Sequence, residues 1–189
     1  MMKKLLPLFF ALVLLLSGCG KDYSTGLHHV ELEVENYGVI KMELDADTAP
    51  ISTENFMKLC EDGFYDGLTF HRIISGFMIQ GGDPEGNGSG GLNKKITGEF
   101  ASNGIDNPIS HVRGTVSMAR SNDPNSASCQ FFIVHEDSTF LDGDYAAFGH
   151  VTEGMEVVDA ICEATQVEDG NGTVAWWNQP IIKEIRVID

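Results

Sequence analysis

Short runs of alternating apolar and polar residues, separated by turns, recur along this chain. Val30, Leu32 and Val34 alternate with glutamates, and a second alternating run at 39–44 follows a turn at 36–38. A period of two residues places the apolar side chains on one face of a strand, and two such runs across a short turn predict a β-hairpin. The 21 glycines among 189 residues supply turns for many more short strands.

The rest of the chain predicts further strands and two helices. Apolar runs predict strands at 70–80, 114–119, 130–134, 147–151 and 181–188. Apolar residues at helical spacing predict one helix between Thr48, its expected N-cap, and Gly63, and a second helix along 155–162. Many short strands with only two helices favour a mainly β fold, a closed antiparallel barrel with helices covering its ends.

The N-terminus is typical of a targeting segment. Lys3 and Lys4 precede an apolar run at 5–16, which is too short to cross a bilayer as a helix but has the length of a signal-peptide core. The run ends in Leu-Ser-Gly-Cys19, which resembles the bacterial lipobox, in which the cysteine is lipidated and becomes the new N-terminus. The resemblance implies a signal peptide at 1–18 and a lipid anchor on Cys19. We therefore expect 19–28 to be a lipidated tether and the protein to lie outside the cytoplasm, anchored to the cell membrane.

Charge and cysteine content disfavour several functions. The formal net charge is −16, and loss of the two leader lysines would leave 10 basic and 28 acidic residues. Such a surface repels phosphate backbones, so we expect no nucleic-acid partner; we interpret the acidity as a source of solubility. Beyond the leader, Cys60, Cys129 and Cys162 cannot all pair and show no CxxC spacing, which disfavours a disulfide framework or a zinc site.

Several motifs then occur in a fixed order. They are FHRIISGFMIQGGD at 70–83, the glycine loop at 86–91, SMAR at 117–120, CQFFI at 129–133 and FLDG at 140–143. In this order and spacing they resemble the cyclophilin family of peptidyl-prolyl cis/trans isomerases, and its bacterial branch in particular. The resemblance covers 29–189, which we expect to be the isomerase domain. It implies an eight-stranded antiparallel barrel with two helices, rotation about the bond before proline, and no cofactor.

The same resemblance implies which residues act. Its catalytic residues are Arg72, Gln80 and Phe132. When an X-Pro amide twists, its nitrogen regains a lone pair, and a charged guanidinium can donate to it; Gln80 would orient Arg72 and contact the substrate backbone. The substrate-binding residues that it implies are Phe77, Met78, Ala119, Arg120, Ser121, Gln130, Phe140, Leu141 and Tyr145. Because the reaction is a rotation, it requires no metal.

Two departures from the family pattern concern the ligand site. Phe140 stands where some eukaryotic members have the tryptophan that favours cyclosporin binding, and Tyr145 stands where many have a histidine. The first leaves drug sensitivity open. The second keeps an aromatic wall with a hydroxyl, so a peptide site is still expected.

Two other functions compete with the isomerase interpretation. A proline-peptide binding module or holdase on the same fold is disfavoured because Arg72, Gln80 and Phe132 are intact. A metal-binding lipoprotein is suggested by six histidines and by an Asp-Gly-Asn-Gly run at 169–172, but that run lacks the closing glutamate of a calcium loop. We therefore predict a monomeric isomerase that acts on proline-containing polypeptides and aids the folding of secreted or envelope proteins.

Overall fold

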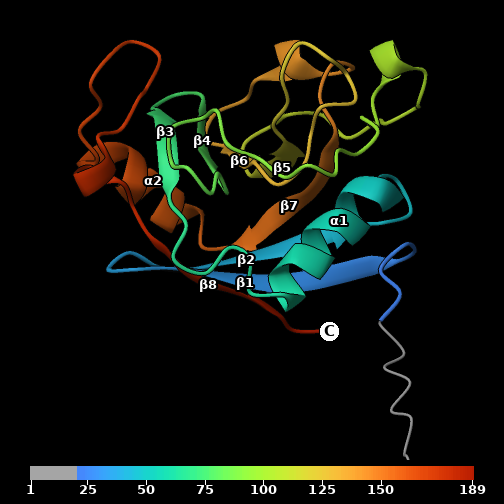
Figure 1. Ribbon diagram of the computed structural model, residues 1–189, viewed down its shortest axis with the longest axis horizontal. Coiled ribbons are helices and arrows are strands. Elements are labelled where there is room, and N and C mark those ends of the chain that lie inside the picture. The colour runs from blue at the N-terminus through green and yellow to red at the C-terminus, as the bar shows by residue number, and fades with distance from the viewer. Residues whose placement is uncertain (1–20) are drawn as a thin grey trace, which may run out of the picture.

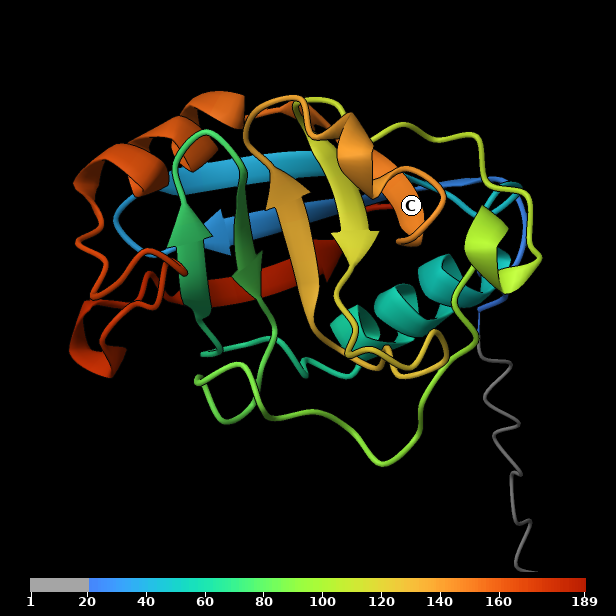
Figure 2. The same cartoon turned by 90° about the horizontal axis from the view of Figure 1, so that it is seen from above.

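Eight antiparallel strands form one curled sheet in the computed structural model, which describes residues 21–189 (Figure 1). The strands are β1 (Leu27–Val34), β2 (Gly38–Asp45), β3 (Phe70–Ile74), β4 (Met78–Gly81), β5 (Thr115–Met118), β6 (Phe131–Val134), β7 (Ala147–Glu153) and β8 (Ile182–Val187). Their order across the sheet is β3-β4-β6-β5-β7-β2-β1-β8. In Figure 2, β3 to β6 cross in front of β1, β2 and β8, and the apolar core lies between these two halves.

The two end strands of the sheet, β3 and β8, do not pair along their lengths. One isolated bridge between Thr69 and Ile181 joins the segments that precede them. The edge of β3 instead pairs with the loop before β8, since Ile73 N donates to Gly172 O (2.8 Å) and Val174 N donates to the carbonyl of His71 (3.0 Å). The mainly β fold with eight strands is confirmed, but the closed barrel is not: the sheet is an open half-barrel.

Two helices lie at opposite ends of the sheet (Figures 1 and 2). The helix α1 (Pro50–Glu61) packs against β8, β2 and β7, and α2 (Met155–Ala164) packs against β2. The apolar side of α1 buries Phe56 and Met57, and that of α2 buries Val158 and Ile161. Both helices were predicted from the spacing of these apolar residues.

The N-terminus of α1 is capped by a residue distant in the sequence rather than by a residue that directly precedes the helix. The N-cap residue is Ala49, and Thr48, which the sequence suggested as the cap, donates its hydroxyl to Asp45 instead (2.7 Å). The buried carboxylate of Glu99 accepts from Ile51 N (2.9 Å) and Ser52 N (2.8 Å). A negative charge at this end of a helix also complements the helix dipole. Glu99 therefore satisfies the free amides that a local cap would have taken.

The folded domain begins earlier than residue 29. Tyr23 is 1% exposed, and its hydroxyl donates to Glu61 at the end of α1 (2.5 Å). Leu27 and His28 already belong to β1. The segment 19–28 was expected to be only a tether, but from Tyr23 onward it packs on the domain, because a tyrosine ring can cover apolar surface while its hydroxyl finds a partner. The predicted signal peptide at 1–18 and Cys19 lie outside the described residues.

Within 21–189, no helix is both long and apolar enough to cross a bilayer.

Candidate active site

The three predicted catalytic residues lie side by side on neighbouring strands. Arg72 on β3 is directly opposite Gln80 on β4, and Gln80 is directly opposite Phe132 on β6. The row continues to Ser117 on β5. Residues directly opposite each other in antiparallel strands project from the same face. The register therefore places an arginine, an amide and an aromatic ring in one line across the sheet.

A tight turn produces this alignment. The sequence suggested one strand at 70–80, but residues 75–77 turn the chain, and β3 and β4 form a hairpin. Gly76 has φ +80°, a left-handed conformation that glycine adopts at little cost. Phe77 N donates to Ile74 O (2.9 Å) and closes the turn. A single straight strand would hold Arg72 and Gln80 far apart, whereas the hairpin places them directly opposite each other.

Arg72 is held from two sides. Its Nη1 donates to Gln80 Oε1 (3.1 Å), and its Nε donates to the backbone oxygen of Asn171 (2.8 Å). Burial lowers the pKa of Arg72, but a guanidinium remains charged at neutral pH. Among the described residues, no acceptor bonds to its Nη2. The group is thus fixed in place while part of its donor capacity remains free.

A chain of side-chain amides continues from Gln80 away from Arg72. Gln80 Nε2 donates to Gln130 Oε1 (2.9 Å), and Gln130 Nε2 donates to Gly90 O (2.7 Å). Each amide uses its oxygen toward one neighbour and its nitrogen toward the next. The direction of the chain fixes the Oε1 atom of Gln80 as the acceptor for Arg72.

A pocket of about 290 Å³ opens beside this row. It is lined by Arg72, Phe77, Met78, Gln80, Ala119, Arg120, Phe132, Phe140, Leu141 and Tyr145. Its floor is apolar, because Met78, Phe132 and Leu141 are buried in a small cluster of their own. The ring of Tyr145 stands edge-on to that of Phe132, with 5.9 Å between centroids. A concave apolar surface with a few polar groups is typical of a small-ligand site.

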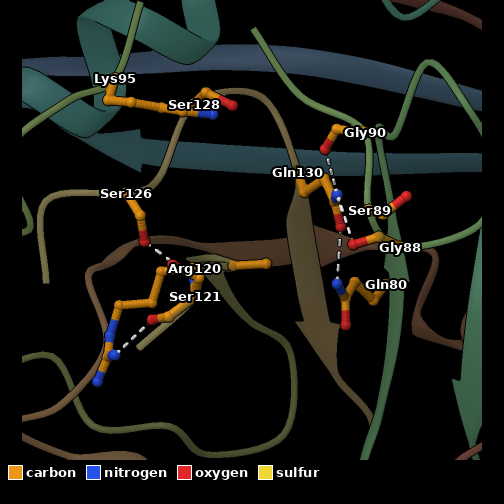
Figure 3. A pocket seen from close by; sticks show the side chains of 11 residues that line it. Gln80, Gly88, Ser89, Gly90, Lys95, Arg120, Ser121, Ser126, Ser128 and Gln130 are labelled. Carbon is orange, nitrogen blue, oxygen red and sulfur yellow. Dashed lines mark hydrogen bonds between the residues drawn. The ribbon is translucent and has the colours of Figure 1, made fainter. Parts of the chain in front are cut away.

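A second pocket of about 240 Å³ adjoins the first and shares Gln80, Ala119 and Arg120 with it (Figure 3). In Figure 3 it lies between the Gln80–Gln130 pair and the glycine loop on one side, and Lys95 with several serines on the other. Its lining is mainly polar, and the other residues are Gly88, Ser89, Gly90, Ser121, Ser126 and Ser128.

The charges that line both pockets have one sign. The charged residues are Arg72, Arg120 and Lys95, and no Asp or Glu lines either pocket. The Arg120 guanidinium lies over the rings of Tyr145 (4.6 Å to the centroid) and Phe100 (5.1 Å), an arrangement that stabilises a cation. In a chain of net charge −16, the cleft is a local concentration of positive charge.

His111 lies beneath the first pocket, and the sequence did not indicate this role. The ring is fully buried and stacks on Phe132 (6.0 Å between centroids, 18° between planes). Its Nδ1 is 2.9 Å from Asp142 Oδ1 and its Nε2 is 3.0 Å from Ser117 Oγ. Burial is the largest influence on the pKa of His111 and lowers it. In the neutral ring, Nδ1–H donates to the carboxylate and Nε2 accepts from the hydroxyl. Phe132 therefore packs on an imidazole ring whose two nitrogens are both hydrogen-bonded.

The structure brings together all twelve residues that were predicted to be catalytic or substrate-binding. Ten of the twelve line the first pocket, and the other two, Ser121 and Gln130, line the second. The sequence analysis missed Lys95, which lines the second pocket from a loop. It also missed Asn171, whose backbone oxygen accepts from Arg72, because a backbone contact leaves no signal in the type of residue.

Cys129 is buried, and burial raises the pKa of its thiol. Within 21–189, no group of three or more His, Cys, Asp or Glu is arranged to hold a metal ion.

Comparison with known proteins identifies the family. The sequence profile described as "Cyclophilin type peptidyl-prolyl cis-trans isomerase/CLD" matches residues 29–187. The chain is 47% identical over 141 residues to the peptidyl-prolyl cis-trans isomerase CYP18-1 of Arabidopsis thaliana, covering 74% of this chain and 86% of that protein. It is 44% identical over 131 residues to peptidyl-prolyl cis-trans isomerase A of Dickeya dadantii, covering 67% of each.

A solved structure supports the same assignment. The cyclophilin type peptidyl-prolyl cis-trans isomerase of Cryptosporidium parvum matches with a TM-score of 0.76 at 31% identity, covering 87% of this chain and 99% of that chain. The crystal structure of that protein in the presence of the dipeptide Ala-Pro matches with a TM-score of 0.75 at 32% identity, covering 85% and 99%. The half-barrel, the motifs and these relatives agree. The chain belongs to the cyclophilin family and is a peptidyl-prolyl cis-trans isomerase.

Proposed function

We propose that Arg72, Gln80 and Phe132 carry the catalysis, and that the enzyme accelerates the folding of secreted or envelope polypeptides. The observation that supports the catalytic assignment is the geometry of Arg72. Its guanidinium lines an apolar pocket, is held through Nε and Nη1, and keeps Nη2 without an acceptor among the described residues. A fixed cation with a free donor beside an apolar pocket suits a proline ring whose nitrogen changes character during the reaction.

Rotation of the X-Pro amide breaks its resonance, at a cost of about 18–20 kcal/mol. At the twisted geometry the proline nitrogen becomes a hydrogen-bond acceptor, which it is not in either planar state. A bond from Arg72 therefore stabilises the transition state selectively, and selective stabilisation is what raises a rate. Because Arg72 is fixed in advance by Gln80 and Asn171, little reorganisation is needed when that bond forms.

The remaining acceleration comes from holding the peptide. A charge-assisted hydrogen bond contributes about 1.5–3 kcal/mol, and each tenfold in rate requires about 1.4 kcal/mol. Phe132 and its apolar neighbours would hold the proline ring and exclude water, while Gln80 would bond the substrate backbone. The backbone near Arg120, with Ala119, Ser121 and Gln130, would hold the segment before proline. The Ala-Pro dipeptide used with the Cryptosporidium relative supports a proline-containing peptide as the substrate of this chain.

The test compares an active-site variant with a matched surface variant. Residues 21–189 contain the whole sheet, both helices and the core, so this segment serves for assays in solution. We expect it to accelerate cis-to-trans relaxation of a short X-Pro peptide, and Arg72→Ala to lower kcat/KM about tenfold or more. Arg113→Ala, which removes a surface cation paired with Asp159 (2.7 Å), should leave the rate within about twofold.

Either of two results would contradict the assignment. An Arg72→Ala variant as active as the wild type would remove Arg72 from the mechanism. A folded wild type without any acceleration would favour the alternative of a proline-peptide binding module, which affinity measurements with the same peptide would then examine.

We infer the location of the enzyme from its N-terminal sequence. The basic, apolar and small-residue segments that end at Cys19 occur in the order of a lipoprotein signal. Stable attachment takes more than one acyl chain. A Cys19 that carries several acyl chains would hold a monomeric enzyme at the outer face of a membrane, where proline isomerisation is slow enough to be a rate-limiting step in the folding of exported chains.

Fractionation of cells that express the full chain tests this location. We expect the protein in the membrane fraction with a mass that corresponds to cleavage before Cys19 plus acyl groups. The Cys19→Ser variant should lose both the acyl mass and the membrane association. A wild type that retains residues 1–18, or that carries no lipid, would contradict the anchor.

A further inference from the structure

Two exposed tryptophans lie next to each other on the loop before β8. Trp176 is 77% exposed and Trp177 is 72% exposed, and their ring centroids are 5.9 Å apart. They belong to a short 3-10 helix, Trp176–Asn178, and line neither pocket of the active site. Large aromatic side chains usually bury most of their surface. Two neighbouring tryptophans that stay exposed are therefore candidates for a site that binds another molecule.

The loop that carries the pair is held firmly by hydrogen bonds. Asn178 N donates to Ala175 O (2.8 Å), and Asn178 Nδ2 donates to Gln166 O (3.0 Å). Gln179 Nε2 donates to Val174 O (2.9 Å). The two indole rings are thus presented on a backbone that is already ordered, which reduces the entropy lost when a partner binds.

The same loop is attached to the walls of the active site at two points. Upstream of the tryptophans, Asn171 O accepts from Arg72 Nε (2.8 Å), and Thr173 forms an isolated bridge with Arg72. Downstream, Gln179 Nε2 donates to Gly86 O (2.8 Å), at the start of the glycine loop whose later residues line the second pocket. The segment that carries the tryptophan pair is therefore tied by hydrogen bonds both to Arg72 and to the glycine loop beside the second pocket.

We propose that Trp176 and Trp177 form an accessory site that binds apolar side chains of an unfolded polypeptide while the X-Pro segment of the same polypeptide occupies the active site. The proposal rests on the proposed function for the identity of the client. A flat aromatic pair without a deep pocket suits side chains of variable shape, which is what an unfolded chain presents.

Charge and position favour a polypeptide over a lipid bilayer as the occupant. Glu168 and Asp169 lie in the same loop, and the whole chain has a net charge of −16, which opposes approach to an anionic membrane surface. Figures 1 and 2 both place the helix of Trp176 and Trp177 at the end of the molecule opposite to residue 21, from which the chain continues toward the proposed anchor. An anchored enzyme would therefore present the pair away from its point of attachment.

Simultaneous binding at two places has a specific consequence for kinetics. A short peptide fills only the active site, whereas a long unfolded chain reaches both sites, and the second contact becomes intramolecular. The tryptophan pair should therefore lower the KM for protein substrates and leave the kinetics of short peptides unchanged.

Intrinsic fluorescence tests the contact directly, because Trp176 and Trp177 are the only two tryptophans in the chain. The probe is a reduced, carboxymethylated polypeptide that contains proline and lacks tryptophan. On its addition to residues 21–189 we expect a blue shift of the emission and at least a twofold loss of iodide quenching. The Arg72→Ala variant should show the same response, so the accessory site can be tested even if the assigned catalysis fails. An unchanged emission at saturating probe would overturn the proposal.

A double variant tests the kinetic consequence. Trp176→Ala/Trp177→Ala should bind the labelled probe at least fivefold more weakly in fluorescence anisotropy, and should catalyse a proline-limited protein refolding reaction with at least fivefold lower kcat/KM, through KM. Its kcat/KM on a tetrapeptide should stay within twofold of the wild type. Leu27→Ala, which trims another exposed apolar residue (53% exposed) on β1, is the matched control and should change neither.

Three further results would overturn the proposal. The first is equal probe affinity of the double variant and the wild type. The second is a loss of tetrapeptide activity in the double variant, which would mean that the pair acts by supporting Asn171 and Arg72. The third is a blue shift with zwitterionic phosphatidylcholine vesicles but not with the polypeptide, which would assign the pair to a bilayer.

Discussion

Acidification from pH 7 to pH 5 is expected to destabilise the folded protein through two buried histidines. His71 is 4% exposed, and His111 is fully buried. Burial is the main cause that lowers the pKa of each ring below its usual 6.5. In the unfolded chain both rings meet water and bind protons near pH 6.5. The unfolded state then binds more protons than the folded state, so the free energy of unfolding falls as the pH drops through this range.

The size of the effect follows from the proton count. Each ring that is neutral when folded and charged when unfolded contributes a slope of about 1.4 kcal/mol per pH unit. Integrated from pH 7 to pH 5, one such ring removes up to about 2 kcal/mol and two rings up to about 4 kcal/mol. Neither ring nitrogen of His71 has a hydrogen-bond partner among the described residues, whereas His111 has Asp142 and Ser117. We therefore expect the larger share from His71.

Urea unfolding at pH 7, 6 and 5, followed by circular dichroism, measures these free energies. His71→Leu and His111→Gln each remove one titrating ring, so the loss between pH 7 and pH 5 should shrink by up to about 2 kcal/mol in each variant. Acidification also relieves repulsion in this acidic chain, an opposite effect that all variants share. His150→Gln, at an exposed position, serves as the control. A double variant of His71 and His111 with the pH dependence of the wild type would refute the reasoning.

Further predictions concern the helix cap, the support of Arg72 and the charge of the cleft. Glu99→Gln should lower the free energy of unfolding by about 1–3 kcal/mol in urea titrations, because one amide oxygen replaces a carboxylate that accepts from both Ile51 and Ser52 amides. Glu54→Gln, at a half-exposed position of the same helix that pairs with Lys58, should cost less than about 0.5 kcal/mol. Gly172→Ala should lower kcat/KM and stability together, since Gly172 has φ +79° and an added Cβ would lie 2.3 Å from a backbone oxygen of β3. Gly170→Ala, where an added Cβ meets nothing within 4 Å, is its control, and equal behaviour of the two would contradict the prediction. Lys95→Glu should reverse the preference between X-Pro peptides that carry glutamate and lysine upstream of proline, measured as a ratio of kcat/KM at low salt.

Local sequence patterns predicted most of the strands and both helices. They did not predict whether the sheet closes into a barrel. Alternation with period two gave the first hairpin, and apolar spacing gave both helices. The predicted cap of α1 was wrong. The partner of the Ile51 amide is Glu99, 48 residues further along the chain, and rules for local capping do not include so distant a residue. The closed barrel was not confirmed because the loop before β8 pairs with the edge of β3. Which segment covers a sheet edge depends on tertiary contacts rather than on periodicity.

The motifs predicted the side chains that face the cleft. They did not predict the turn and the buried residues that hold those side chains in place. Without the family resemblance, Phe132 and Leu141 read as ordinary core residues and Arg72 as a surface charge. The sequence alone also merged β3 and β4 into one strand, although the turn between them is what places Arg72 opposite Gln80. The buried ring of His111 supports Phe132 from below, and a single histidine before a strand carries no signal of that role.

The hydrogen bonds that position the Arg72 guanidinium show why a sequence motif describes only part of such a site. One of its two partners, Gln80, is a side chain within the same hairpin, and the motif includes it. The other is the backbone oxygen of Asn171, 99 residues away, and every residue type offers such an oxygen. What places it is the loop conformation: Asp169 Oδ1 accepts from Asn171 N (2.9 Å) and Thr173 N (3.1 Å), and Gly172 permits close contact with β3. The residues that control the position of the Arg72 guanidinium therefore include Asp169 and Gly172, which do not bond to it, and substitution of either should lower kcat while the residues that line the pocket stay unchanged.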